Sequence, residues 1–129
     1  MCPILWKKIR LELAPTDGFP KGSAGRSYLL QVPVNPHGEI DAPELERYPM
    51  RATFRRFWSS EPDEYGTVAR ADSHWRLCYD RKDEEASFRL GLQALRLGSE
   101  VTVEDPDGTS WRFRVTDIKH LDKTSHPSR

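Results

Sequence analysis

Short runs in which apolar and polar residues alternate are the feature that most restricts the fold of this chain. Charged and apolar residues alternate from Lys8 to Leu13, and every even-numbered residue from Tyr28 to Val34 is apolar. A period of two places one set of side chains on one face of an extended strand. The two runs therefore predict half-buried β-strands, each with one face turned toward a core.

Similar short runs continue along the chain and predict further strands. The last two flank Asp105–Gly108, where Pro106 presets φ and Gly108 accepts a positive φ, so we predict a β-hairpin there. The spacing within Phe88–Leu97 fits both a strand and a helical turn, and we interpret it as irregular or strand. The further predicted strands are Met50–Trp58, Thr67–Arg70, Trp75–Tyr79, Glu100–Glu104 and Ser110–Ile118.

Turn and capping residues separate the predicted strands. Pro15–Gly25 is rich in Pro, Gly, Ser and Asp, which predicts a loop, and we expect Phe19 to fold it onto the core. Asn35–Gly38 carries a turn residue at every position. A short helix is expected to begin at Asp41, whose carboxylate can accept a hydrogen bond from the Glu44 amide.

The size and composition indicate one β-rich domain. A chain of 129 residues with 36% hydrophobic residues suits a single thin core. Six to seven short strands, one helix and no βαβ alternation predict an antiparallel sheet closed into a barrel or folded into a sandwich. We expect residues 8–119 to form this domain, residues 1–7 to be an N-terminal extension and residues 120–129 to be a disordered tail.

Charge and cysteine content favour a cytoplasmic protein. Lys and Arg number 20, equal to Asp and Glu, so no overall field attracts nucleic acid, anionic lipid or acidic substrates. Cys2 and Cys78 do not form a disulfide framework and are expected to be reduced thiols. No run resembles a signal peptide or reaches transmembrane length, so we expect no membrane partner.

Three motifs resemble a family of small uncharacterised proteins of proteobacteria, chiefly alphaproteobacteria. The motifs lie at Phe19–Ser23, Gly38–Asp41 and Arg55–Glu64, and the resemblance extends over Lys8–Ile118. The chain departs from the family at Asp72–His74, where the family usually has a Gly-Gly pair, so this turn is expected to differ. The resemblance implies an intact domain of bacterial origin and implies no reaction, cofactor or substrate.

Arginine and aromatic residues gather in Arg47–Trp58, which contains four arginines and no acid. Arginines neutralise phosphates and aromatic faces stack on bases, which is the chemistry of a single-strand-binding groove. The same pattern is typical of a solvated sheet face whose arginines pair with nearby acids, and the zero net charge favours that interpretation. The predicted partner-contact region comprises Arg51, Arg55, Arg56, Trp58, Glu61, Asp63, Glu64, Tyr65 and Trp75.

Metal and catalytic sites find little support in the sequence. The acids of Glu61–Glu64 and Asp80–Glu85 could ligate calcium, but they lack EF-hand spacing, and charged surface loops are the default interpretation. His74 and Cys78 supply two zinc ligands where four are needed. Cys78 as a nucleophile would need a base such as His37, His74 or His120 and has no flanking motif. We predict no metal, cofactor or catalytic residue.

Our leading hypothesis is a non-enzymatic β-barrel module that binds a partner. A single-stranded nucleic-acid-binding protein is one alternative, and its partner would be RNA or single-stranded DNA. A small hydrolase-type enzyme that uses loop carboxylates with His37 or His74 is another. A structural subunit that self-associates through exposed aromatic residues is the third.

Overall fold

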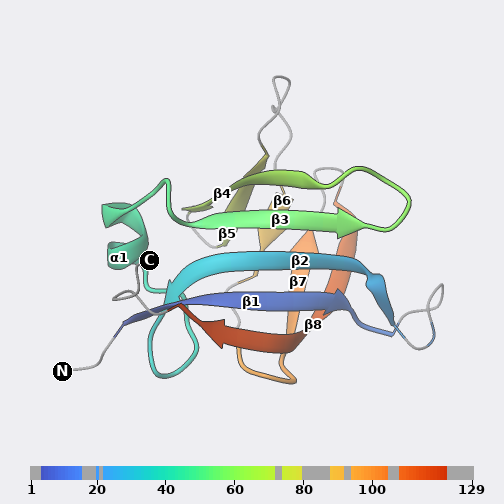
Figure 1. Cartoon of the computed structure of the whole chain (residues 1–129), viewed down its shortest axis with the longest axis horizontal. Coiled ribbons are helices and arrows are strands. Elements are labelled where there is room, and N and C mark those ends of the chain that lie inside the picture. The colour runs from blue at the N-terminus through green and yellow to red at the C-terminus, as the bar shows by residue number, and fades with distance from the viewer. Residues whose placement is uncertain are drawn as a thin grey trace, which may run out of the picture.

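A computed structural model of the chain describes residues 4–15, 20, 22–71, 74–79, 88–91, 94–104 and 108–121. Eight antiparallel strands form a closed barrel, in which each strand pairs with its sequence neighbours and β8 returns to pair with β1 (Figure 1). The strands are β1 (Leu5–Leu13), β2 (Ser23–Val34), β3 (Thr53–Trp58), β4 (Glu64–Arg70), β5 (Trp75–Tyr79), β6 (Phe88–Leu90), β7 (Glu100–Glu104) and β8 (Ser110–His120).

The predicted fold class is confirmed, because the chain is mainly antiparallel β with one short helix. The strand count is eight rather than six to seven. Strand β4 begins at Glu64, three residues before the predicted start at Thr67, because Glu64, Tyr65 and Gly66 also pair with β3. The ambiguous region contributes β6. The predicted hairpin is confirmed by the pairing of Glu104 with Ser110.

Strands β1 and β8 also extend beyond the predicted domain boundaries of 8–119. Strand β1 begins at Leu5, and Trp6 lies in the core, so this part of 1–7 belongs to the barrel. Strand β8 runs to His120, and Leu121 packs against the core. The predictions for Phe19, for the loop 80–85 and for the tail from 122 onward lie outside the described residues.

The helix α1 (Ala42–Arg47) lies beside one end of the barrel (Figure 1). The predicted cap is confirmed, since Asp41 Oδ2 accepts a hydrogen bond of 2.9 Å from the Glu44 amide. Leu45 is buried, and Trp6 Nε1 donates to Glu44 Oε2 at 3.3 Å. These contacts attach α1 to the start of β1. Among the described residues, no helix has the length and apolar character that a bilayer span requires.

Aromatic rings fill the barrel interior. The Phe54 and Tyr79 rings lie 4.8 Å apart between centroids, and Tyr28 lies 5.2 Å from Phe113, both edge-to-face. Gly66 has no side chain at a point where a Cβ atom would meet the Cys78 carbonyl oxygen and lie 2.7 Å from Phe54 Cε2. The interior is therefore a packed core, and a binding site has to be sought on the outer surface.

Candidate binding groove

Strand β3 divides the predicted contact residues between two faces of the sheet. Phe54 and Trp58 are buried, whereas Arg55 and Phe57 are exposed on the outer face. This division follows from the alternation of side chains along a strand. Adjacent members of the arginine and aromatic cluster therefore have different environments.

The cluster members on the inner face of β3 link the two strands of the β3–β4 hairpin. Only 16% of the Arg56 side chain is exposed, and its guanidinium lies 3.0 Å from Glu64 Oε1 and 3.3 Å from Glu61 Oε1. The same guanidinium lies over the Trp58 ring, 4.1 Å from its centroid. These contacts indicate that Arg56, Trp58 and Glu64 stabilise the hairpin.

Two further predicted contact residues also lie away from the outer face of β3. Trp75 is buried in the core, with the Arg70 guanidinium 5.2 Å from its ring centroid. The Arg51 guanidinium lies 4.5 Å from the centroid of the Trp6 ring, toward the α1 end of the barrel. The structure therefore does not bring the nine predicted residues into one surface.

The outer members, Arg55, Asp63 and Tyr65, belong to a surface that crosses four strands. The strand register places Arg10, Leu29, Arg55 and Tyr65 in one row across β1, β2, β3 and β4. Directly paired residues in neighbouring strands have Cβ atoms about 5 Å apart. This register brings together residues that are distant in the sequence.

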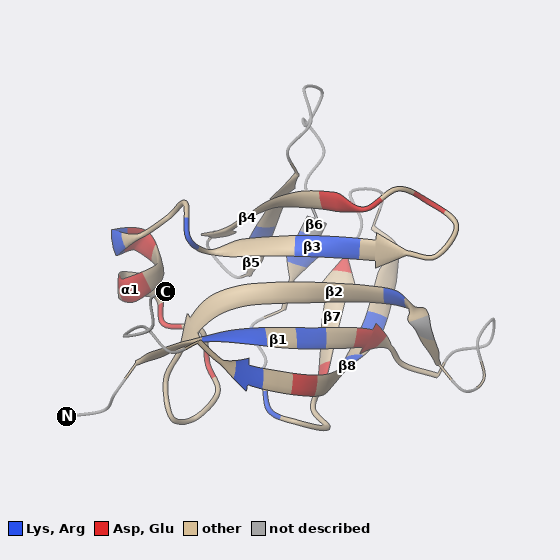
Figure 2. Cartoon of the chain, in the orientation of Figure 1, with Lys and Arg blue, Asp and Glu red and all other residues tan. Residues whose placement is uncertain are grey.

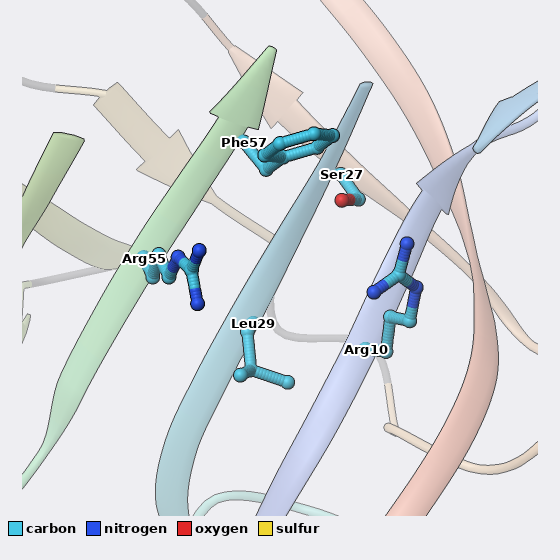
Figure 3. Close-up of a pocket in the computed structure, with 5 residues that line it drawn as sticks. All are labelled: Arg10, Ser27, Leu29, Arg55 and Phe57. Carbon is cyan, nitrogen blue, oxygen red and sulfur yellow. The ribbon is translucent and has the colours of Figure 1, made fainter. Parts of the chain in front are cut away.

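Two adjoining pockets follow this row and form what we call the β1–β4 groove. The first has a volume of about 230 Å³ and is lined by Arg10, Ser27, Leu29, Arg55 and Phe57 (Figure 3). The second, of about 460 Å³, shares Leu29 and Arg55 with the first. Its other lining residues are Lys8, Gln31, Met50, Thr53, Phe54, Tyr65, Gly66 and Thr67.

Charge in the groove is nearly balanced. Arg55 Nη2 lies 2.6 Å from Asp63 Oδ2, and this hydrogen-bonded carboxylate raises the pKa of the Arg55 guanidinium above its ordinary value. Arg10 Nε lies 2.8 Å from Glu12 Oε2. Figure 2 shows both basic and acidic residues along β1, and basic residues on β3 beside acidic residues at the start of β4. Lys8 has no ion pair within the described part of the chain.

Ser27 has an unusual position in the groove. Its relative exposure is 3%, the lowest of the residues that line the first pocket, and it lies between Arg10 and Phe57 (Figure 3). Its hydroxyl has no hydrogen-bond partner among the residues that the structure describes. Buried hydroxyl groups are usually hydrogen-bonded. Sequence reasoning missed Ser27 and Leu29 as site residues, although Leu29 interrupts the alternation of β2 with an apolar residue on the polar face.

The histidines and loop acids of the enzyme hypothesis are not gathered at this groove. His74 lines another pocket, of about 230 Å³, with Arg89, Thr102 and Glu104. The carbonyl oxygen of His37, in the turn before α1, accepts a hydrogen bond from Arg96. Within the described ranges, no three His, Cys, Asp or Glu side chains are arranged to hold a metal ion.

The fold and the groove define a structural class: a closed antiparallel β-barrel with a filled interior and a groove on the outside of its strands. Comparisons of the chain with protein-family models, curated proteins and solved structures found no match. The resemblance to the proteobacterial family therefore stays a prediction. The geometry of the groove carries the functional argument.

Proposed function

We propose that this protein is a non-enzymatic interaction module that binds a segment of a partner protein in the β1–β4 groove. The observation that carries the proposal is the gathering of exposed Met50, Phe57 and Tyr65 beside two arginines. Met50 is 80% exposed and Tyr65 is 53% exposed. Methionine, aromatic residues and arginine are the residue types enriched at protein interfaces, and clusters of them supply most of the binding energy.

The barrel topology supports recognition through side chains. Among the described residues every strand has a neighbour on both sides, so the barrel has no edge strand to which a partner could add a β-strand. The two pockets, of about 230 and 460 Å³, have room for more than one partner side chain. A partner segment that crosses β1 to β4 would place successive side chains in these pockets.

Nucleic acid is a less suitable occupant, because the arginines of this region already have acidic partners. Arg10 pairs with Glu12, and Arg55 pairs with Asp63. A phosphate backbone would have to compete with these carboxylates, whereas single-strand binding depends on cations that are available to phosphates. A protein segment gains most from burial of apolar surface and needs fewer new ion pairs.

The cellular location belongs to the same proposal. We infer a bacterial, cytoplasmic protein, and the lack of a disulfide framework in the sequence supports this location. Fractionation of cells that produce a tagged chain checks it, and recovery of the tagged chain outside the cytoplasmic fraction would overturn it.

The test is selection of binders from a displayed library of random 12-residue peptides, with the intact protein as target. Selected peptides should lose most of their affinity for Phe57→Ala and Tyr65→Ala, about tenfold or more for each central aromatic residue. Leu97→Ala is the matched control, because Leu97 is an exposed apolar residue that does not line the groove. This control should bind the peptides like the unchanged protein.

A parallel titration with a mixed-sequence single-stranded 12-mer, followed by amide chemical shifts at low and higher salt, tests the alternative. We expect no salt-dependent shifts at Arg55, Phe57 and Tyr65. If the oligonucleotide shifts these residues at low salt and selected peptides do not, the partner class is nucleic acid and the proposal is wrong. Peptides that bind equally well to the groove variants would also overturn it.

A further inference from the structure

We infer that the first pocket of the groove, at Ser27, receives the carboxylate of an acidic side chain of the partner protein. This inference rests on the proposed function and adds the chemistry of one recognised group. The pocket combines a buried hydroxyl, two guanidinium groups and an apolar wall (Figure 3).

The Ser27 hydroxyl is the first component of this subsite. It is buried and lines the pocket, and no described residue forms a hydrogen bond with it. Burial of a hydroxyl without a hydrogen bond lowers the stability of the free protein. A ligand atom that accepts a hydrogen bond from this hydroxyl removes that penalty and so gains binding free energy. A carboxylate oxygen accepts from a hydroxyl and forms a stronger hydrogen bond than a neutral acceptor.

The two guanidinium groups are the second component. Arg10 and Arg55 are both paired with Leu29 in the strand register, one on each side of it. Figure 3 shows their side chains on opposite sides of Leu29, with the Ser27 hydroxyl farther along the same strand. Asp63 engages Nε and Nη2 of Arg55, and a guanidinium has five N–H donors, so Arg55 retains donors for a second carboxylate.

The apolar wall is the third component. Leu29 and Phe57 line the pocket beside the polar groups. The methylene groups of a glutamate or aspartate can pack on these side chains while the carboxylate reaches Ser27 and the arginines. A volume of about 230 Å³ holds such a side chain together with part of its backbone.

Charge balance favours a carboxylate over a phosphate. Glu12 and Asp63 lie within hydrogen-bonding distance of Arg10 and Arg55, so the four groups sum to a formal charge of zero. A phosphate monoester carries a charge of about −1.5 to −2 at neutral pH and is repelled more strongly by these two acids than a single carboxylate is. A single carboxylate therefore meets less repulsion in this pocket than a phosphate does.

The experiment uses amide chemical-shift titrations of the intact protein with three tripeptides. The probe is acetyl-leucyl-glutamyl-leucine amide, and the two controls place glutamine or phosphoserine at the central position. The glutamyl peptide should shift the amides of Ser27, Leu29 and Arg55. It should bind at least about fivefold more tightly than the glutaminyl peptide, because only the carboxylate can form a charge-assisted hydrogen bond.

Variants identify the groups that recognise the carboxylate. Ser27→Ala should weaken binding of the glutamyl peptide about tenfold and leave the weaker glutaminyl peptide almost unaffected. Arg55→Gln should also weaken binding of the glutamyl peptide. Because Arg55 is exposed, we expect this variant to fold, so it tests the site even if Ser27→Ala does not fold. Arg112→Gln is the control, since Arg112 is an exposed arginine paired with Glu100 across β7 and β8.

Several outcomes would overturn the inference. Equal affinity for the glutamyl and glutaminyl peptides, or tighter binding of the phosphoseryl peptide, would exclude carboxylate recognition. Library peptides that bind the groove but bind Ser27→Ala equally well would refute the Ser27 subsite and leave the proposed function intact. If no peptide, from the library or with a central glutamate, binds at the groove, the proposed function and the Ser27 subsite are both wrong.

Discussion

The hydroxyl oxygens of Tyr28 and Tyr79 lie 3.1 Å apart inside the barrel, although the two residues are 51 positions apart in the chain. They come from β2 and β5, and in this hydrogen bond one buried phenol donates and the other accepts. Burial, and then the neighbouring Tyr28, raises the pKa of Tyr79 far above its ordinary value.

This raised pKa makes stability depend on pH in the alkaline range. The unfolded chain releases the Tyr79 proton near the ordinary value of 10.0, while the folded chain still holds it. The contribution of Tyr79 is complete below pH 10 and is lost as the pH rises above it. We expect the free energy of unfolding to fall by up to about 1.4 kcal/mol per pH unit above pH 10, measured by urea unfolding.

Two conservative variants isolate the group responsible. Tyr79→Phe should flatten the alkaline decline, because it removes the group that titrates differently in the two states. Tyr65→Phe should keep the decline, since Tyr65 is exposed. An unchanged slope in Tyr79→Phe would show that another group causes the pH dependence.

The two neighbouring arginines of β3 should differ in their contribution to stability. Arg56→Gln leaves the partly buried Glu64 without this ion pair and should lower the free energy of unfolding by about 2 kcal/mol. The Arg55 side chain is 49% exposed, and Arg55→Gln should lower the free energy of unfolding much less, because solvent screens its ion pair with Asp63. Urea unfolding of both variants measures the difference. Equal decreases in the free energy of unfolding would contradict a structural role for Arg56 in the β3–β4 hairpin.

Gly66 is expected to tolerate no side chain. A Cβ atom there would overlap the Cys78 carbonyl and press on the Phe54 ring, so Gly66→Ala should lower the free energy of unfolding by about 3 kcal/mol. Gly25→Ala is the matched control, because its Cβ would lie 3.1 Å from Ser59 Oγ, an atom of a short surface side chain that can move. Thermal unfolding compares the two variants, and a Gly66→Ala protein as stable as Gly25→Ala would contradict the close packing.

Trp6 tests the position of the domain boundary. Its ring is buried in the core, so Trp6→Ala should cost about 3 to 5 kcal/mol. The adjacent Leu5→Ala should cost less than about 1 kcal/mol, because Leu5 is exposed on the outer face of the same strand. If urea unfolding gives similarly small losses for both, Trp6 does not belong to the core.

Local pattern was sufficient to predict much of this fold. Alternation identified the inner face of β2 at Tyr28 and Leu30, and the cap at Asp41 identified the start of α1. Alternation did not identify the start of β4, because its first residues are of types that are common in turns. Glu64 and Gly66 follow an acidic loop, but they belong to β4 because they pair with β3. Trp6 was placed in the predicted extension because Ile4, Leu5 and Trp6 form a continuous apolar run, which lacks the alternation that marks a half-buried strand.

The groove could not be predicted in the same way, because it depends on strand register. Arg10, Leu29 and Arg55 become neighbours only when β1, β2 and β3 align as they do here. Sequence clustering grouped Arg55 with Arg56, but one residue along a strand reverses the direction of the side chain. Arg55 and Tyr65 therefore reach the groove, and Arg56 and Trp58 do not.

The pairing of β1 with β8 has a consequence for how the chain folds. Each other strand pair joins strands that are consecutive in the chain, and the connection of β2 to β3, residues 35–52, contains α1. These contacts close shorter loops than the pairing of β1 with β8 does, so they form with a smaller loss of chain entropy. The pairing of β1 with β8, in which Lys7 lies opposite His120, joins the two ends of the described chain. Closure of the barrel therefore brings together the strands that are farthest apart in the sequence, and we expect this step to slow folding more than any hairpin does.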